Sequence, residues 1–315
     1  MESPETGLLR ALCFHTVWGY APTRAELLSS WDGGLQPSPQ PGLQPPRFSD
    51  ENRPPLSGGY TSLLDRGLIL ERRGRCVFAG HEDLIAEHER REGWFPRKIR
   101  VAQLAVRWFC RIGGVRFVAV CNTTALGHGR NDGDIDFIII GRAGRLWQIR
   151  AWAAVWFWFM RRRPSESYGQ QDAVCLSFFV DDEHLDLAPL MLGEDDVYFR
   201  HWFLSLLPLY DDGVGRELWR QNASIRKCHP CARPWTINPY IGTDPVRLRI
   251  PVLAFLEKPA RFIQTKAFGP AIREAMNRDT RVVVRDGVLK FHVEDGREAY
   301  RDRYRELCKD YGIEP

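Results

Sequence analysis

The sequence predicts an α/β (α+β) fold in which a mixed sheet is flanked by helices. An apolar strand over 115–120 is followed by a loop of small and polar residues and by a second apolar strand that ends at Ile140. Helix-like segments precede the first strand and follow the second, an alternation that is typical of α/β proteins. The 315 residues allow more than one domain. We expect a small N-terminal domain over 1–92, a core over 93–183 and a mostly helical C-terminal region over 184–315.

The N-terminal segment reads as three helices followed by a hairpin. Thr23 and Glu26 form a capping-box pattern ahead of the second helix. A Pro-rich and Gly-rich insertion over 33–55 precedes the third helix, and the hairpin turns at Arg73-Gly74. This order suggests a winged-helix-like unit, which could bind DNA. Because the third helix carries a single arginine, Arg66, we favour packing or protein binding over DNA binding.

Two acids, Asp134 and Asp136, lie one residue apart at the start of the second strand. Side chains at positions i and i+2 of a strand point to the same face, so both carboxylates should project together. Four apolar residues over 137–140 follow directly, and an unneutralised charge beside them would be costly. Mg²⁺ or Mn²⁺ would neutralise such a pair, since both prefer oxygen ligands. The alternative is a turn over 131–133 that carries solvated acids.

This pattern resembles the DNA polymerase beta-type nucleotidyltransferase superfamily. Its members place a Gly-Ser or Gly-Gly pair after an apolar strand, and Asp-x-Asp on the next strand. The chain has Asn122-Thr123 and Asp134-Ile135-Asp136 at these places. More narrowly, it is similar to uncharacterised prokaryotic nucleotidyltransferase-like proteins with a winged-helix-like N-terminal region. Their later motifs match Arg145-Leu146-Trp147 with Arg150, residues 175–179, and residues 291–295.

The resemblance implies a Mg²⁺-dependent nucleotidyltransferase that moves a nucleoside monophosphate from a nucleoside triphosphate (NTP) to an acceptor. The acceptor could be a small molecule, a protein or an RNA, bound between the core and the C-terminal region. Asp134 and Asp136 would be catalytic and would hold the metal ion. The superfamily's third acid lies on a later strand, here 173–180, which contains none. Asp181, at the end of that strand, is the candidate for the third catalytic position.

Five residues are candidates for nucleotide binding. The Thr123 hydroxyl and nearby backbone amides could approach phosphate oxygens, and Gly127 lets the loop bend. His128 could contact a phosphate or be an ordinary surface residue. Arg150 could bind the triphosphate. Asn122 stands where the superfamily has glycine. Its side chain prevents the close approach of a ligand to the backbone that glycine allows, although Asn tolerates unusual backbone angles.

These departures leave a second interpretation open. A chain without the glycine pair and without a third acid could bind one metal ion and a nucleotide while catalysing poorly. It would then be a nucleotide-sensing regulator or binding protein that acts through the winged-helix-like module.

Composition adds few constraints. The net charge of +4 is too weak to indicate a nucleic-acid partner. The eight cysteines form no disulfide framework, and the N-terminus shows no apolar signal region, which predicts a cytoplasmic protein. Cys228-His-Pro-Cys231 lacks a second cysteine pair, so we interpret it as a loop rather than a zinc site.

The apolar run over 151–160 is shorter than the roughly 20 residues that a membrane span requires, so no transmembrane segment is predicted. We interpret this run as a helix that flanks the sheet. A helix lying in a membrane interface is the alternative, because the run is rich in tryptophan and three arginines follow it.

Overall fold

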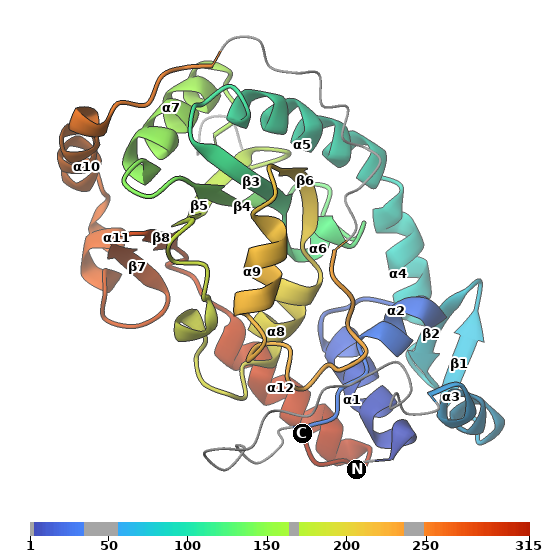
Figure 1. Ribbon diagram of the computed structural model, residues 1–315. Helices are drawn as coiled ribbons and strands as arrows, with labels where there is room; N and C mark the ends of the chain where they lie inside the picture. Colours follow the sequence, from blue (N-terminus) through green and yellow to red (C-terminus); the bar gives the residue numbers. More distant parts are fainter. Residues whose placement is uncertain (1–2, 35–55, 164–169, 236–248) are drawn as a thin grey trace, which may run out of the picture.

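A mixed β-sheet lies at the centre of the molecule, with helices on both faces (Figure 1). The computed structural model describes residues 3–34, 56–163, 170–235 and 249–315. Within these ranges the larger sheet has the strand order β6-β3-β4-β5-β8-β7. The strands are β3 (Val115–Val120), β4 (Ile135–Gly141), β5 (Val174–Asp181), β6 (Leu207–Asp211), β7 (Val282–Arg285) and β8 (Val288–Phe291). Only the β4–β5 pair is parallel in this sheet, so the predicted mixed sheet with flanking helices is confirmed.

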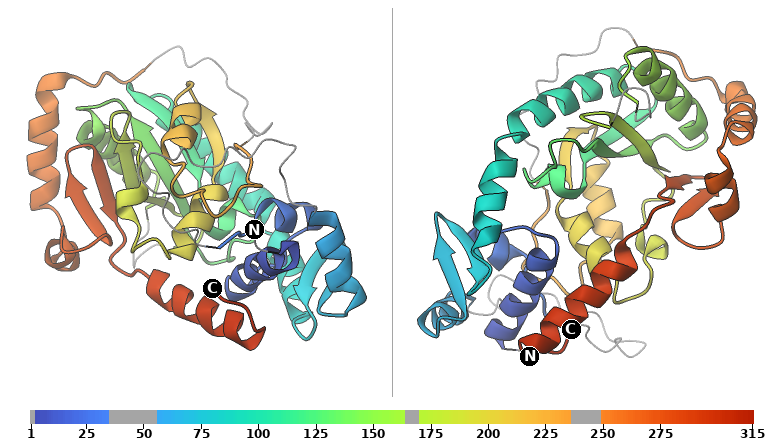
Figure 2. Two further views of the ribbon diagram at one scale, coloured as in Figure 1. Left: turned by 60° about the horizontal axis from the view of Figure 1, so that its bottom comes forward. Right: turned by 180° about the vertical axis from the view of Figure 1, so that it is seen from behind.

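The apolar run of β4 supplies two separate cores, one on each face of the sheet. Phe137 packs among residues of α5 and α7, whereas its neighbour Ile138 packs among residues of α8 and α9. This division follows from the alternation of side chains along a strand. Figure 2 shows the two faces from different sides. The helices are α5 (Phe95–Phe109), α6 (Asn122–Ala125), α7 (Leu146–Phe159), α8 (Val197–Leu204) and α9 (Gly215–Gln221).

The C-terminal region is not mostly helical, because it supplies three strands of the central sheet. The sequence suggests a helix over 187–208, but the α-helix found there, α8, covers only Val197–Leu204, and β6, which pairs with β3, begins at Leu207. Pro208 is tolerated there because β6 is an edge strand. The sequence over 282–293 predicts strand-like segments around a turn at Asp286-Gly287, and this turn does join β7 to β8. The expected boundary at 183–184 therefore cuts through one continuous sheet.

The C-terminal helices lie at the periphery of this sheet. α10 (Glu257–Lys266) packs beside α7, and α11 (Pro270–Ala275) precedes the β7–β8 hairpin. The last helix, α12 (Arg297–Asp310), runs from the sheet to the N-terminal unit and packs along α1. The two chain ends consequently lie close together, as Figure 1 shows.

The N-terminal unit has the predicted order of helices and hairpin. Thr23 caps α2, and the capping box with Glu26 is present. Positions 35–55 of the expected insertion lie outside the described residues. The unit shares its apolar core with α8 and α12, so its packing is continuous with the rest of the chain. Its elements are α1 (Pro4–Val17), α2 (Arg24–Ser29), α3 (Leu56–Asp65), β1 (Ile69–Arg72), β2 (Arg75–Phe78) and, leading into the core, α4 (Asp83–Glu92).

The tryptophan-rich helix α7 is half-buried against the sheet. Trp147 and Phe157 lie in the core, whereas Trp158 is 73% exposed and Phe159 is 67% exposed. Trp156 stacks on Trp108 of α5 with a ring-centroid distance of 3.4 Å. The helix therefore flanks the sheet, as expected, and also presents an apolar outer side. In the described part of the chain, no helix has the length and apolar character that a membrane crossing would need.

Candidate active site

Asp134, Asp136 and Cys175 gather where β4 and β5 begin. Asp136 belongs to β4, Asp134 immediately precedes that strand, and Cys175 is the register partner of Asp136 on β5. One potential ligand atom from each residue lies within 4.8 Å of the other two. The parallel pairing of β4 with β5 thus brings together the two predicted acids and a thiol that sequence reasoning did not place in the site.

Burial and mutual repulsion shape the charges of this group. Burial, chiefly, and the nearby Asp136 carboxylate together raise the pKa of Asp134 to about 6. Burial and both carboxylates raise the pKa of the Cys175 thiol well above its ordinary value, so it is neutral at pH 7. A divalent cation would reverse these shifts. Two carboxylates fit Mg²⁺ or Mn²⁺, but a neutral thiol adds no hard ligand, so the donor set suits one cation better than two.

Asn122 contacts one of the two acids, Asp136, directly. Its Nδ2 donates to Asp136 Oδ2 at 2.7 Å, and its Oδ1 accepts from the Tyr198 hydroxyl at 3.1 Å. The backbone of Asn122 has a φ of 58°, in the left-handed region that glycine and asparagine tolerate best. Asparagine can therefore take the backbone conformation that glycine would have, and it adds a hydrogen bond that fixes the Asp136 side chain.

The loop after α6 places the remaining predicted loop residues differently. Thr123 is half-buried in α6, and Gly127 has a φ of 69°, which supports its predicted role in bending the loop. His128, by contrast, is fully buried: its Nδ1 lies 3.2 Å from His88 Nδ1, and its ring edge meets Tyr20. Burial, chiefly, lowers the pKa of His128 to about 3. His128 therefore attaches the loop to the N-terminal unit and is not exposed to a phosphate.

The structure does not bring Asp181 to the acids. Asp181 pairs with Gly141 at the far end of β5, whereas Cys175 pairs with Asp136. At about 3.3 Å per strand residue, this separation is roughly 20 Å. The Asp181 carboxylate instead lies 2.6 Å from Nδ1 of His184. The expected third acid is thus in the wrong place, and Cys175 occupies the adjacent position on β5. The motif at 175–179 pointed to this strand, but the sequence does not reveal its register.

Arg150 and Arg163 supply positive charge near Cys175. Arg150 Nη1 donates to Gln264 Oε1 at 2.7 Å, while its Nε is buried without a hydrogen-bond partner. Burial, chiefly, and the neighbouring charge of Arg163 lower the pKa of Arg150 to about 10. Burial also lowers the pKa of Arg163, and nearby Cys175 partly offsets the lowering in both arginines. Among the described residues, no carboxylate lies within 4.0 Å of either guanidinium. An anionic ligand would therefore be favourable here.

A pocket of about 230 Å³ adjoins the acids, between the sheet, α8 and the start of α12. Burial lowers the pKa of Lys290 to about 8 and that of His292 to about 3. His292 Nε2 lies 2.9 Å from Ser177 Oγ. These groups make the pocket polar and able to hydrogen-bond a ligand. Its lining includes Asn122, Asp136, Tyr198, Lys290, His292, Glu294, Asp295 and Tyr300.

Lys98 positions the backbone just before the acids. Its Nζ donates to the Gly133 carbonyl at 2.6 Å and to Asp172 Oδ1 at 3.0 Å. Both charged side chains are almost completely buried, so this ion pair fixes the loop and the approach to β5 together. The sequence predicted a role for neither Lys98 nor Asp172. The amphipathic pattern of α5, which carries several arginines, does not show that the Lys98 side chain points inward.

Residues 175–179 belong to β5, and residues 291–295 end β8 and reach the pocket. Arg145-Leu146-Trp147 opens α7 instead beside Gly141, at the end of β4 that is far from the acids. No protein-family model, no curated protein and no solved structure matches the chain in comparisons with known proteins.

Proposed function

We propose that the protein is a Mg²⁺-dependent or Mn²⁺-dependent nucleotidyltransferase that moves a nucleoside monophosphate from an NTP to an acceptor. The observation that carries the proposal is the convergence of Asp134 and Asp136, the second of which lines a pocket with polar groups. The charge of Arg150 near Cys175 supports an anionic substrate. This combination of a carboxylate pair, cations and an acceptor-sized pocket is what the reaction requires.

Asp134 and Asp136 would hold the cation, which, when bound, would neutralise triphosphate charge and favour attack on the α-phosphate. Asn122 would keep the Asp136 carboxylate oriented through its 2.7 Å hydrogen bond. Arg150 and Arg163 would bind phosphate oxygens, as guanidinium groups do well. The acceptor would occupy the pocket, where neutral His292 and the Lys290 ammonium group can hydrogen-bond it.

The first test compares Asp136 with Asp132, an aspartate of the turn just before β4. Asp136→Asn should abolish Mg²⁺-dependent NTP binding and nucleotidyl transfer. Asp132→Asn is the matched control, because Asp132 is 70% exposed and pairs only with Arg130 among the described residues. Binding is measured by calorimetry with each NTP, and transfer by labelled nucleotide incorporation into small-molecule, protein and RNA fractions. Wild-type protein that binds no NTP in Mg²⁺ would refute the proposal.

A nucleotide-sensing protein with reduced catalysis is the second candidate, favoured by the neutral thiol of Cys175 in place of a third carboxylate. Such a protein would bind Mg²⁺ and NTP without detectable transfer. Replacing Cys175 with Asp should then increase Mg²⁺ affinity and introduce transfer, with Cys175→Ser as the control of similar size. If wild-type protein already transfers nucleotides efficiently, the sensing candidate is excluded.

DNA binding by the N-terminal unit remains less favoured than protein binding. Arg75 of the hairpin lies between Glu26 and Glu92, and Arg73 pairs with Glu89 at 2.6 Å. These pairs reduce the positive charge that DNA would meet. A mobility shift with mixed genomic DNA at low salt would contradict this expectation.

A further inference from the structure

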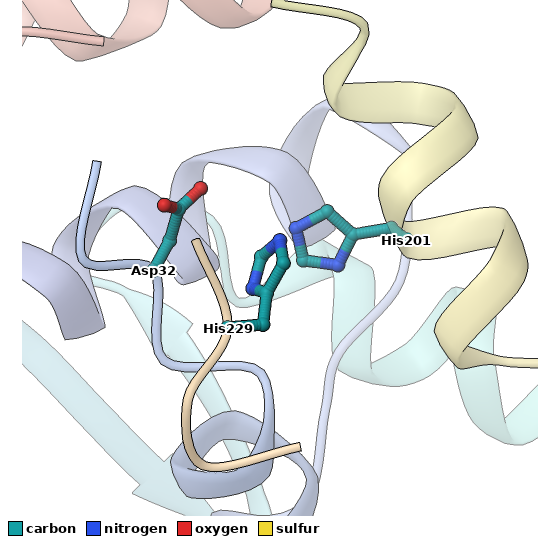
Figure 3. A group of neighbouring side chains, drawn as sticks. All are labelled: Asp32, His201 and His229. Atoms are coloured by element: carbon teal, nitrogen blue, oxygen red, sulfur yellow. The ribbon is translucent and has the colours of Figure 1, made fainter. Parts of the chain in front are cut away.

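A second group of potential metal ligands lies where the N-terminal unit meets the core. Asp32 follows α2, His201 belongs to α8, and His229 lies in the 228–231 loop (Figure 3). One potential ligand atom of each residue lies within 4.8 Å of the other two. The residues are 1%, 3% and 2% exposed, respectively. Three segments that are distant in sequence thus place two imidazoles and a carboxylate around one buried point.

The hydrogen bonds leave ring nitrogens of both histidines without partners. His229 Nδ1 lies 3.2 Å from the Ser30 carbonyl, which can only accept, so Nδ1 carries the proton and donates. His229 Nε2 consequently bears a lone pair, and it is buried with no hydrogen-bond partner. His201 Nε2 is also buried without a partner. Figure 3 shows the two rings turned toward each other.

Unpartnered nitrogens of this kind cost free energy in a protein interior. A histidine that donates from one ring nitrogen to a carbonyl and offers the other is the usual arrangement of a metal ligand. Neutral imidazole is the form that binds metal, and the hydrogen bond from Nδ1 to the Ser30 carbonyl leaves His229 Nε2 available as the ligand atom.

The ion pair between Arg200 and Asp32 explains why the Asp32 carboxylate is buried, but not why the two histidines lie beside it. Arg200 Nη2 lies 3.6 Å from Asp32 Oδ2, and the Gly34 backbone N–H donates to Asp32 Oδ1 at 2.8 Å. These contacts provide a reason for burying the Asp32 carboxylate. They do not provide a partner for either imidazole Nε2, and one ring nitrogen of each histidine lies within 4.8 Å of a carboxylate oxygen of Asp32.

We infer that Asp32, His201 and His229 form a structural Zn²⁺ site that ties the N-terminal unit to the core. Two imidazoles and a carboxylate suit zinc, which is commonly bound by four ligands. A water molecule could complete the coordination. His15 is another candidate, since its Nδ1 is buried without a partner and its ring centroid lies 5.6 Å from that of His201. This site is separate from the acids of the proposed nucleotidyltransferase and does not depend on that function.

The test starts with wild-type protein that has been stripped with a chelator and then titrated with Zn²⁺ or Co²⁺. We expect uptake of one Zn²⁺ per chain and a rise in Tm, because the ligands come together only in the folded chain. Bound Co²⁺ should show visible bands of tetrahedral coordination without a thiolate charge-transfer band. Failure to take up Zn²⁺, uptake without a rise in Tm, or a thiolate band would each overturn the inference.

Single substitutions then locate the ion. His201→Gln and His229→Gln should each lose the Zn²⁺ and the zinc-dependent rise in Tm. Asp136→Asn should keep both, which excludes the Asp134–Asp136–Cys175 group as the binding site. His128→Gln, a buried histidine at another contact of the N-terminal unit, is the control for general destabilisation and should also keep the ion. Retention of Zn²⁺ by both folded histidine variants, or its loss in Asp136→Asn alone, would contradict the assignment.

Discussion

At the scale of single residues, Asn122 combines a left-handed backbone conformation with a hydrogen bond to the carboxylate of Asp136. Its φ of 58° would be comfortable for glycine and unfavourable for most other residues. The side chain of Asn122 is held between Asp136 and Tyr198. The residue thus serves the backbone turn and the orientation of a carboxylate at once, and substitutions can separate these two roles.

Asn122→Gly should keep the stability of the protein nearly unchanged, because glycine accepts this φ without strain. Asn122→Ala should reduce the free energy of unfolding by about 1–3 kcal/mol, since alanine meets the full cost of the left-handed conformation. Urea denaturation of the two variants beside the wild type measures this difference. Both variants lose the hydrogen bond to Asp136, so equal destabilisation would show that the hydrogen bond, and not the backbone, determines the effect.

At the scale of elements, α7 has one side in the core and one side exposed. Phe157 is buried between α5 and the sheet and packs on Phe109 with a ring-centroid distance of 5.3 Å. The adjacent Trp158 is 73% exposed. Because consecutive helix residues point about 100° apart, two neighbouring aromatic residues can have opposite energetic roles.

Phe157→Ala should reduce the free energy of unfolding by about 3–5 kcal/mol through the cavity that it leaves. Trp158→Ser should change it by no more than about 0.5 kcal/mol, as for ordinary surface substitutions. Chemical denaturation of the purified variants gives both values. A large loss in Trp158→Ser would mean that the outer side of α7 is covered in solution.

The elements also show how far the sequence predicts the structure. Apolar runs correctly located the strands β3, β4 and β5. The segment around Pro208 was misread as helix because its leucines fit a helical spacing, and only pairing with β3 makes it a strand. The same limit applies to the site: Asp134 and Asp136 share a short motif, whereas Cys175 and Lys98 join them through strand register and tertiary packing.

At the scale of the whole molecule, buried neutral histidines connect separate parts of the fold. His128 links the loop after α6 to the N-terminal unit, and His292 links the end of β8 to Ser177 of β5. Burial is the main cause that lowers the pKa of each to about 3. Both side chains therefore resist protonation in the folded state, whereas in the unfolded chain they titrate near an ordinary pKa of about 6.5.

The protein should consequently lose stability in acid. Above about pH 6.5 the two histidines are neutral in both the folded and the unfolded state. Between about pH 6.5 and the folded-state pKa of about 3, they bind protons only in the unfolded state, so lowering the pH favours unfolding. Each such histidine lowers the free energy of unfolding by at most about 1.4 kcal/mol per pH unit in this window. His128→Gln should make the dependence between pH 5 and pH 6.5 less steep. Denaturation midpoints measured across this range test the slope, and an unchanged slope would contradict the assignment.

The strand order of the central sheet has a consequence for synthesis on the ribosome. β5 pairs on one edge with β4, close in sequence, and on the other with β8, which lies more than a hundred residues later along the chain. Until residues 288–291 emerge, the backbone amides and carbonyls on that side of β5 lack their final partners, and exposed strand edges invite aggregation. Such high contact order also slows folding. The nascent chain is therefore most vulnerable after its acids are in place and before the pocket beside them has closed.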